Sequence, residues 1–177
     1  MQGIYRVQGA DSEYLESFVA APGPAGWRYF GRVSSVESEA ELFTVDFVVD
    51  ADWRLVRYRE GHADGSELLA AHVGTGIQIA RQLDHDERDF DVPDAEVIWS
   101  SSPCSLLIAQ RRASASRVNR VIGARIDGES PIPLTISFPG SDWVNGTLEV
   151  GVDGQVIRCV VDDEAPVSAD GWFERIS

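Results

Sequence analysis

The stretch TLEVGVDGQVIRCVV, residues 147–161, is the part of the chain that most clearly predicts a fold. Apolar and polar residues alternate on both sides of a central Asp-Gly dipeptide, which favours the two-residue type I′ turn of a β-hairpin. This turn would place Val150 opposite Ile157 on one face of the hairpin and Glu149 opposite Arg158 on the other. One face is then apolar, and the other carries an opposite-charge pair worth roughly 0.2–1 kcal/mol.

A second hairpin is expected around residues 50–52, with 42–49 and 54–59 as its two strands. Its first arm also alternates with a period of two, as a half-buried strand does. That arm resembles residues 147–153, which makes a weak internal repeat. Further strands are expected at 14–20, 27–34, 66–73, 77–83, 95–100, 106–111, 121–126 and 134–138.

Some segments leave alternatives open. Residues 66–83 also fit a helical period, but Gly74 and Gly76 argue against one long helix, so two strands are preferred there. Residues 113–119 are compatible with either a short helix or an extended segment. Loops or acidic connections are expected at 21–26, 84–94 and 162–170.

Length and composition indicate a single, mainly β domain covering residues 1–177, with few short helices. A chain of this length buries about 70% of the surface that its unfolded form exposes, so it can build a core without metals or disulfides. The hydrophobic content of 44% is typical of a globular protein. Cys104 and Cys159 are far apart in sequence and are interpreted as reduced thiols.

The charge of the chain excludes some partners. Its formal net charge is −14, from 29 acids and 15 bases, and every base is arginine. Such an acidic surface repels phosphate backbones, so nucleic acid is not expected as a partner. We find no apolar segment of membrane-spanning length and no signal-peptide pattern, so a cytoplasmic location without a transmembrane segment is expected.

No catalytic, metal or cofactor site is expected from the sequence. The histidines, His62, His72 and His85, are not spaced so that one strand or helix could offer two metal ligands. No nucleophile motif of the Gly-x-Ser-x-Gly type is present. The weakest of three functional hypotheses is a small hydrolase or isomerase that uses His72 or His85 with a neighbouring acid.

Two groups of side chains could line a binding site. The five tryptophans are large rings that serve either as core residues or as the walls of an apolar pocket. The pair Arg111 and Arg112 could clamp the carboxylate or phosphate head group of a ligand. Salt bridges to surface acids are the alternative interpretation of this pair.

Three stretches, taken together, resemble the bacterial glycolipid-binding family, in which glycolipid binding is itself an inference. Residues 94–112 hold an Asp-led strand, the turn Ser-Pro-Cys-Ser at 102–105, and an apolar run that ends in two arginines. Residues 47–54 are similar to the Asp-x-x-Trp hairpin of the family, and residues 148–154 to its closing strand, followed by an aromatic patch at 171–175. The resemblance implies a strongly curled antiparallel sheet, similar to a half-open β-roll of lipid-carrier type, without catalytic residues.

The main hypothesis is therefore a non-catalytic protein that holds a lipid or glycolipid-like molecule on the concave face of a curled sheet. A protein-interaction or scaffold domain with a filled core is the alternative, and it would show an exposed apolar patch or edge. The side chains expected to bind the ligand are Trp53, Trp99, Ser105, Arg111 and Arg112.

Overall fold

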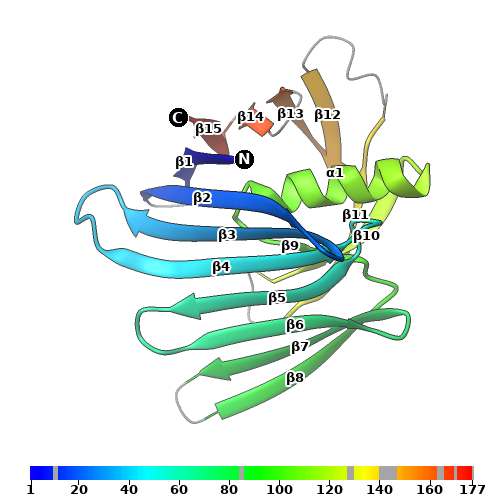
Figure 1. The fold of residues 1–177 in the computed structure, drawn as a ribbon, viewed down its shortest axis with the longest axis horizontal. Coiled ribbons are helices and arrows are strands. Elements are labelled where there is room, and N and C mark those ends of the chain that lie inside the picture. The colour runs from blue at the N-terminus through cyan, green and yellow to red at the C-terminus, as the bar shows by residue number, and fades with distance from the viewer. Residues whose placement is uncertain are drawn as a thin grey trace.

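A computed structural model describes residues 1–9, 12–83, 86–126, 130–139, 147–162, 166–169 and 171–176. Within these residues the chain forms one sheet of fifteen strands and one helix, α1 (Cys104–Ser116) (Figure 1). The strands are β1 (Gln2–Gln8), β2 (Glu13–Gly23), β3 (Gly26–Ser35), β4 (Glu41–Asp50), β5 (Leu55–His62), β6 (Glu67–Val73), β7 (Gly76–Leu83), β8 (Asp86–Pro93), β9 (Val97–Trp99), β10 (Arg120–Arg125), β11 (Ile132–Ser137), β12 (Thr147–Val152), β13 (Gln155–Val161), β14 (Pro166–Ala169) and β15 (Phe173–Arg175). The expected mainly β fold is confirmed.

The sheet is a meander that is joined in its middle by the two ends of the chain. Strands β1 to β8 follow one another across one half, and β15 to β9 follow one another across the other. The halves meet where β1 pairs antiparallel with β15, with Tyr5 opposite Arg175. All described pairs are antiparallel except that of β9 with β10, which is parallel.

Both expected hairpins are confirmed, the first with its register. Strands β12 and β13 pair Val150 with Ile157 and Glu149 with Arg158, and the last two side chains form a salt bridge of 3.3 Å. Their turn contains Asp153 and Gly154, both with positive φ, as a type I′ turn requires. Strands β4 and β5 form the second hairpin, and residues 66–83 form the strand pair β6 and β7.

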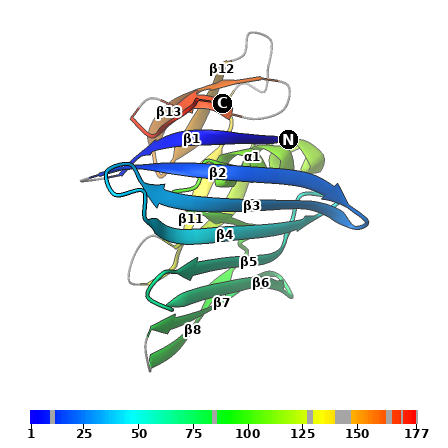
Figure 2. The same cartoon turned by 60° about the vertical axis from the view of Figure 1, so that its left-hand side comes forward.

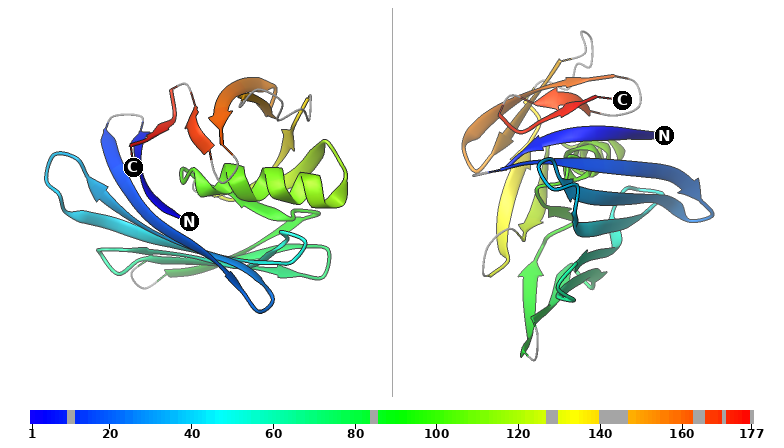
Figure 3. Two further views of the ribbon diagram at one scale, coloured as in Figure 1. Left: turned by 45° about the horizontal axis from the view of Figure 1, so that its top comes forward. Right: turned by 90° about the vertical axis from the view of Figure 1, so that its left-hand side faces the viewer.

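The sheet curls until its far end returns to its first half, without closing (Figures 2 and 3). The backbone N–H of Leu55 donates to the carbonyl oxygen of Glu96, just before β9, at 3.0 Å. The Arg81 guanidinium donates to the carbonyl oxygen of Ile126, just after β10, at 2.8 Å. A curled, open antiparallel sheet is therefore the architecture, as expected.

Aromatic rings fill much of the space inside the curl. Tyr5 stacks on Phe18 with ring centroids 4.9 Å apart, and Phe18 stacks on Tyr29 at 5.2 Å. Phe47 meets Tyr58 edge to face at 4.6 Å. These buried rings form a continuous core across β1 to β5, so any hollow must lie beside them.

One expected strand is wrong, because residues 106–111 lie in the helix α1. The first seven residues of α1 are all buried, since the helix lies along the concave side of the sheet (Figure 3). A helix that is buried on most sides loses the 3.6-residue apolar period by which helices are predicted. The open question at residues 113–119 is answered by the same helix, which continues to Ser116.

Three expected connections are wrong in part. Residues 86–93 form the edge strand β8, whose many acids resemble a loop in the sequence but are common on exposed sheet edges. Residues 166–169 form β14. The expected loop at 21–26 shrinks to a tight turn, because β2 continues to Gly23 and β3 begins at Gly26. Asp84 and His85 lie outside the described residues.

Candidate functional site

The N-terminal half of α1 forms one wall of a pocket. The hydroxyl oxygen of Ser102 accepts the backbone N–H of Cys104 at 3.2 Å, which satisfies one of the free donors at the start of the helix. Leu107, Ile108 and Arg111 follow at spacings that place them on one side of the helix. All three side chains line the pocket.

Strands β2, β3 and β4 form the opposite wall. Because side chains alternate across a strand, Ala20 of β2 faces the same side as Tyr29 of β3 and Phe47 of β4. Trp27 and Val49 form the next row, and all five line the pocket. The wall is therefore apolar from β2 to β4.

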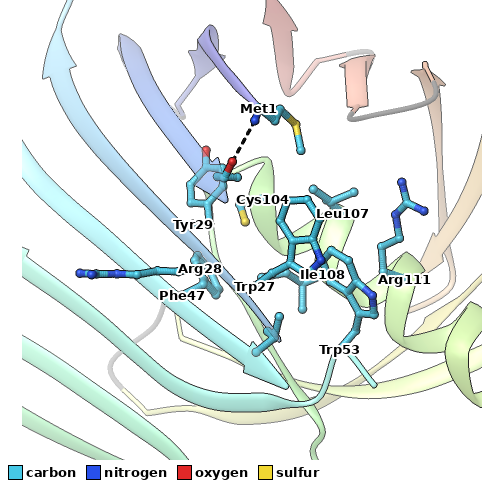
Figure 4. A pocket seen from close by; sticks show the side chains of 12 residues that line it. Met1, Trp27, Arg28, Tyr29, Phe47, Trp53, Cys104, Leu107, Ile108 and Arg111 are labelled. Atoms are coloured by element: carbon cyan, nitrogen blue, oxygen red, sulfur yellow. Dashed lines mark hydrogen bonds between the residues drawn. The ribbon is translucent and has the colours of Figure 1, made fainter. Parts of the chain in front are cut away.

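The turn between β4 and β5 brings Trp53 to the mouth of the pocket. The carboxylate of Asp50 accepts the backbone N–H groups of Asp52 and Arg54, each at 2.9 Å, and Trp53 adopts a left-handed backbone with φ of 62°. The Trp53 ring stacks on Trp27 at 5.7 Å between centroids, and the Arg111 guanidinium lies 5.8 Å from the Trp53 ring centroid. Figure 4 shows these side chains around the pocket.

The pocket encloses about 440 Å³ and is partly open to solvent. Its described lining holds no acidic side chain, although the protein carries a net charge of −14. Arg28 also lies at the pocket, but its side chain points away in Figure 4 and binds the Asp46 carboxylate at 2.8 Å. Arg111 is the other basic side chain in the described lining of the pocket.

The five side chains expected to bind the ligand do not gather in one place. Trp53 and Arg111 line the pocket, and Trp99, Ser105 and Arg112 do not. Trp99 packs against Trp172 at 5.3 Å, and the Ser105 hydroxyl donates to the carbonyl oxygen of Ser102 at 2.7 Å, where it shapes the start of α1.

Arg112 is a structural residue. Its side chain is 9% exposed, and its guanidinium donates to the Glu96 carboxylate at 2.6 Å and to the carbonyl oxygen of Asp52 at 3.2 Å. These bonds tie α1 to the segment before β9 and to the turn that carries Trp53. Two neighbouring arginines thus have different surroundings, since successive side chains of a helix point about 100° apart.

A buried carboxyl group lies behind the pocket. Glu16 is fully buried, and its Oε1 accepts hydrogen bonds from the Tyr29 hydroxyl at 2.6 Å and the Ser102 hydroxyl at 2.7 Å. Burial raises the pKa of Glu16 from 4.5 to about 7, against the opposing effect of these two hydrogen bonds, and Glu60 raises it further. Glu16 is not among the site residues expected from the sequence, although it lies between Tyr14 and Phe18 on the inward face of β2.

The two described histidines, His62 and His72, lie away from the pocket. His62 contacts the Glu60 carboxylate at 2.7 Å, and burial lowers the pKa of His72, followed by the effect of Arg54. Neither histidine lines the pocket. Within the described ranges, no three His, Cys, Asp or Glu side chains come together as a candidate metal site.

Comparison with known proteins adds no name to this site. No protein-family model matches the chain, and no solved structure matches it. Among the described residues, no helix has the length and apolar character needed to cross a membrane.

Proposed function

We propose that the protein binds an apolar or amphipathic small molecule, lipid or glycolipid-like, in the pocket between α1 and strands β2 to β4. The observation that carries the proposal is a partly open hollow of about 440 Å³ beside the aromatic core, lined mainly by apolar and aromatic side chains. Small-molecule sites usually enclose about 300–1,000 Å³ and are lined mainly by apolar and aromatic side chains with a few polar groups. The lining described above has this character.

The walls favour a ligand with an apolar body. Each methylene group that a ligand buries contributes about 0.8 kcal/mol. The interior side chains Ala20, Phe47, Leu107 and Ile108 offer such a surface. A chain or ring system of modest size would meet apolar atoms on both the helix and the sheet side.

The mouth favours a polar or anionic head group on the same ligand. The Arg111 guanidinium offers donors suited to a carboxylate or phosphate. The stacked rings of Trp27 and Trp53 lie beside it and can pack against the region where the ligand changes from apolar to polar. An amphipathic molecule fits this order of surfaces better than a purely apolar one.

The proposed role is binding without catalysis. Burial raises the pKa of the Cys104 thiol, which lines the pocket, so this thiol is kept in the unreactive protonated form. The sequence resemblance to the bacterial glycolipid-binding family points in the same direction.

Filling the pocket should weaken binding. We expect Ala20→Phe to weaken the binding of a dansyl-labelled fatty acid by about tenfold or more, because the new ring occupies the space of the ligand, at a cost of at least about 1.4 kcal/mol in affinity. Ala21→Phe is the matched control, since Ala21 is the next residue of β2 and is exposed on the opposite face. Dansyl emission during titration measures both affinities.

A parallel measurement tests the native ligand. Solvent extracts of the protein purified from its host are analysed by mass spectrometry, with the Ala20→Phe protein purified in the same way. We expect lipid in the extracts of the unmodified protein and of Ala21→Phe, and much less lipid in the extract of Ala20→Phe. Absence of both co-purified lipid and probe binding in a protein with native circular dichroism would overturn the proposal.

Arg111 should select anionic head groups. We expect Arg111→Gln to weaken binding of the dansyl-labelled fatty acid by about fivefold, corresponding to a partly exposed charge interaction of about 1 kcal/mol. Binding of the neutral probe N-phenylnaphthylamine should stay unchanged. Arg120→Gln, at an exposed position in β10, is the control for the loss of one positive charge. An equal loss of affinity for the fatty acid and for N-phenylnaphthylamine would contradict the role of Arg111 in binding a head group.

A further inference from the structure

Glu16 lies where the two walls of the pocket meet. Its hydrogen-bond donors belong to both walls, because Tyr29 lines the sheet side and Ser102 holds the N–H of Cys104 at the start of the helix side. The Glu16 carboxyl group lies close to the backbone of Gly31 on β3. Glycine leaves the room for it, because a Cβ atom at this position would lie 2.7 Å from Oε1 of Glu16. A carboxyl group has thus been built into the junction of β2, β3 and α1.

Only one of the two oxygens of Glu16 is satisfied. Both hydroxyl donors bind Oε1, whereas Oε2 is buried and has no hydrogen-bond partner among the described residues. In the ionised state Oε2 would be a charged oxygen without a hydrogen-bond donor. This costs far more free energy than a neutral hydroxyl group without a partner. The arrangement therefore suits the protonated side chain.

The neighbours of Glu16 supply no compensating positive charge. Its ionisation is opposed by burial first and then by the charge of Glu60 on β5. The titratable groups that interact with it are Tyr5 on β1, Tyr14 on β2, Tyr29 on β3, Tyr58 and Glu60 on β5, and Cys104 on α1. None of these groups carries a positive charge, and among them only the Tyr29 hydroxyl stabilises the carboxylate, through its hydrogen bond to Oε1.

We infer that Glu16 is a proton-binding site coupled to the pocket, so that the neutral side chain favours the ligand-filled state and the ionised side chain favours the empty, hydrated one. The inference rests on the proposed function. Ionised Oε2 needs a donor, and water that enters the empty pocket can supply one past Tyr29, whose ring lines the pocket and whose hydroxyl is bonded to Glu16. A ligand that fills the pocket expels this water and therefore binds together with one proton.

Titration with a neutral ligand tests this coupling without a change in the charge of the ligand. We expect the dissociation constant of N-phenylnaphthylamine to rise about threefold or more between about pH 6 and about pH 8.5, because binding then requires uptake of a proton. Glu16→Gln mimics the neutral side chain and should bind with the same affinity at both pH values. Calorimetry in two buffers of different ionisation enthalpy should show proton uptake for the unmodified protein near neutral pH.

His62→Gln is the control, since it removes another titrating side chain, a half-exposed histidine whose pKa is raised by its hydrogen bond to Glu60. This variant should keep the pH dependence of the unmodified protein. Equal pH dependence in the unmodified protein and in Glu16→Gln, or binding without proton uptake, would overturn the inference and leave the proposed function intact. Absence of probe binding at every pH would instead overturn the proposed function.

Discussion

Glu16→Gln should make the protein more stable by about 3 kcal/mol at alkaline pH and leave its stability nearly unchanged at acidic pH. The pKa of Glu16 is raised from 4.5 to about 7 by burial, and this difference corresponds to about 3 kcal/mol. Because the folded state binds this proton more tightly than the unfolded chain, the stability it contributes is fully present below about pH 4.5. That contribution is lost as the pH rises through about 7.

The measurement is urea denaturation of both proteins at several pH values, with the free energy of unfolding compared at each. Comparing the two proteins removes the contributions of other titrating groups, such as His62, that they share. Glu37→Gln, at an exposed position, should follow the unmodified protein throughout. If the free energies of unfolding of Glu16→Gln and the unmodified protein differ by the same amount at every pH, Glu16 stays in one ionisation state across that range.

Arg112→Met should lower the free energy of unfolding by about 2–3 kcal/mol. The substitution keeps an apolar side chain of similar length but removes the bonds to the Glu96 carboxylate and to the carbonyl oxygen of Asp52. Breaking a well-buried ion pair costs about 3–5 kcal/mol, and the Glu96 side chain is 28% exposed, so a smaller loss is expected here. The melting temperature should fall by roughly 5–10 °C for a chain of this size.

Arg111→Met is the matched control, because it removes the same charge from the adjacent helix position. It should lower stability by less than about 1 kcal/mol, since Arg111 lies at the pocket mouth over Trp53. Thermal unfolding followed by circular dichroism distinguishes the two variants. Equal destabilisation by both would contradict the separation of a structural arginine from a ligand-facing one.

The strands and their pairing could largely be predicted because they depend on local patterns. The Asp153-Gly154 turn fixes the register of β12 and β13, and alternation alone located β4 and β5. The helix could not be predicted, because its first seven residues are buried on most sides and show no helical period. The edge strand β8 was hidden for the opposite reason, since acids on an exposed edge look like a loop.

The site could be predicted only in part because it is assembled from distant segments. Trp53 and Arg111 were expected to bind the ligand, and they lie on a turn and a helix that meet only after folding. Trp27 is one of five tryptophans for which the sequence leaves open a core role or a pocket role, and its place in the pocket is seen only in the folded sheet. Glu16 gave a signal as a carboxylate on an apolar strand face, but only the folded chain shows that this face is enclosed.

The pairing of β1 with β15 has a consequence for assembly in the cell. Tyr5 lies opposite Arg175, and its hydroxyl donates to the carbonyl oxygen of Pro166, so the central seam of the sheet joins segments about as distant in sequence as this chain allows. During synthesis, β1 leaves the ribosome before β15 and must wait for its partner with one backbone edge bare. Bare edges invite pairing with other chains. Nascent chains that stop before β15 should therefore aggregate, and chaperones that shield strand edges should raise the yield of native protein.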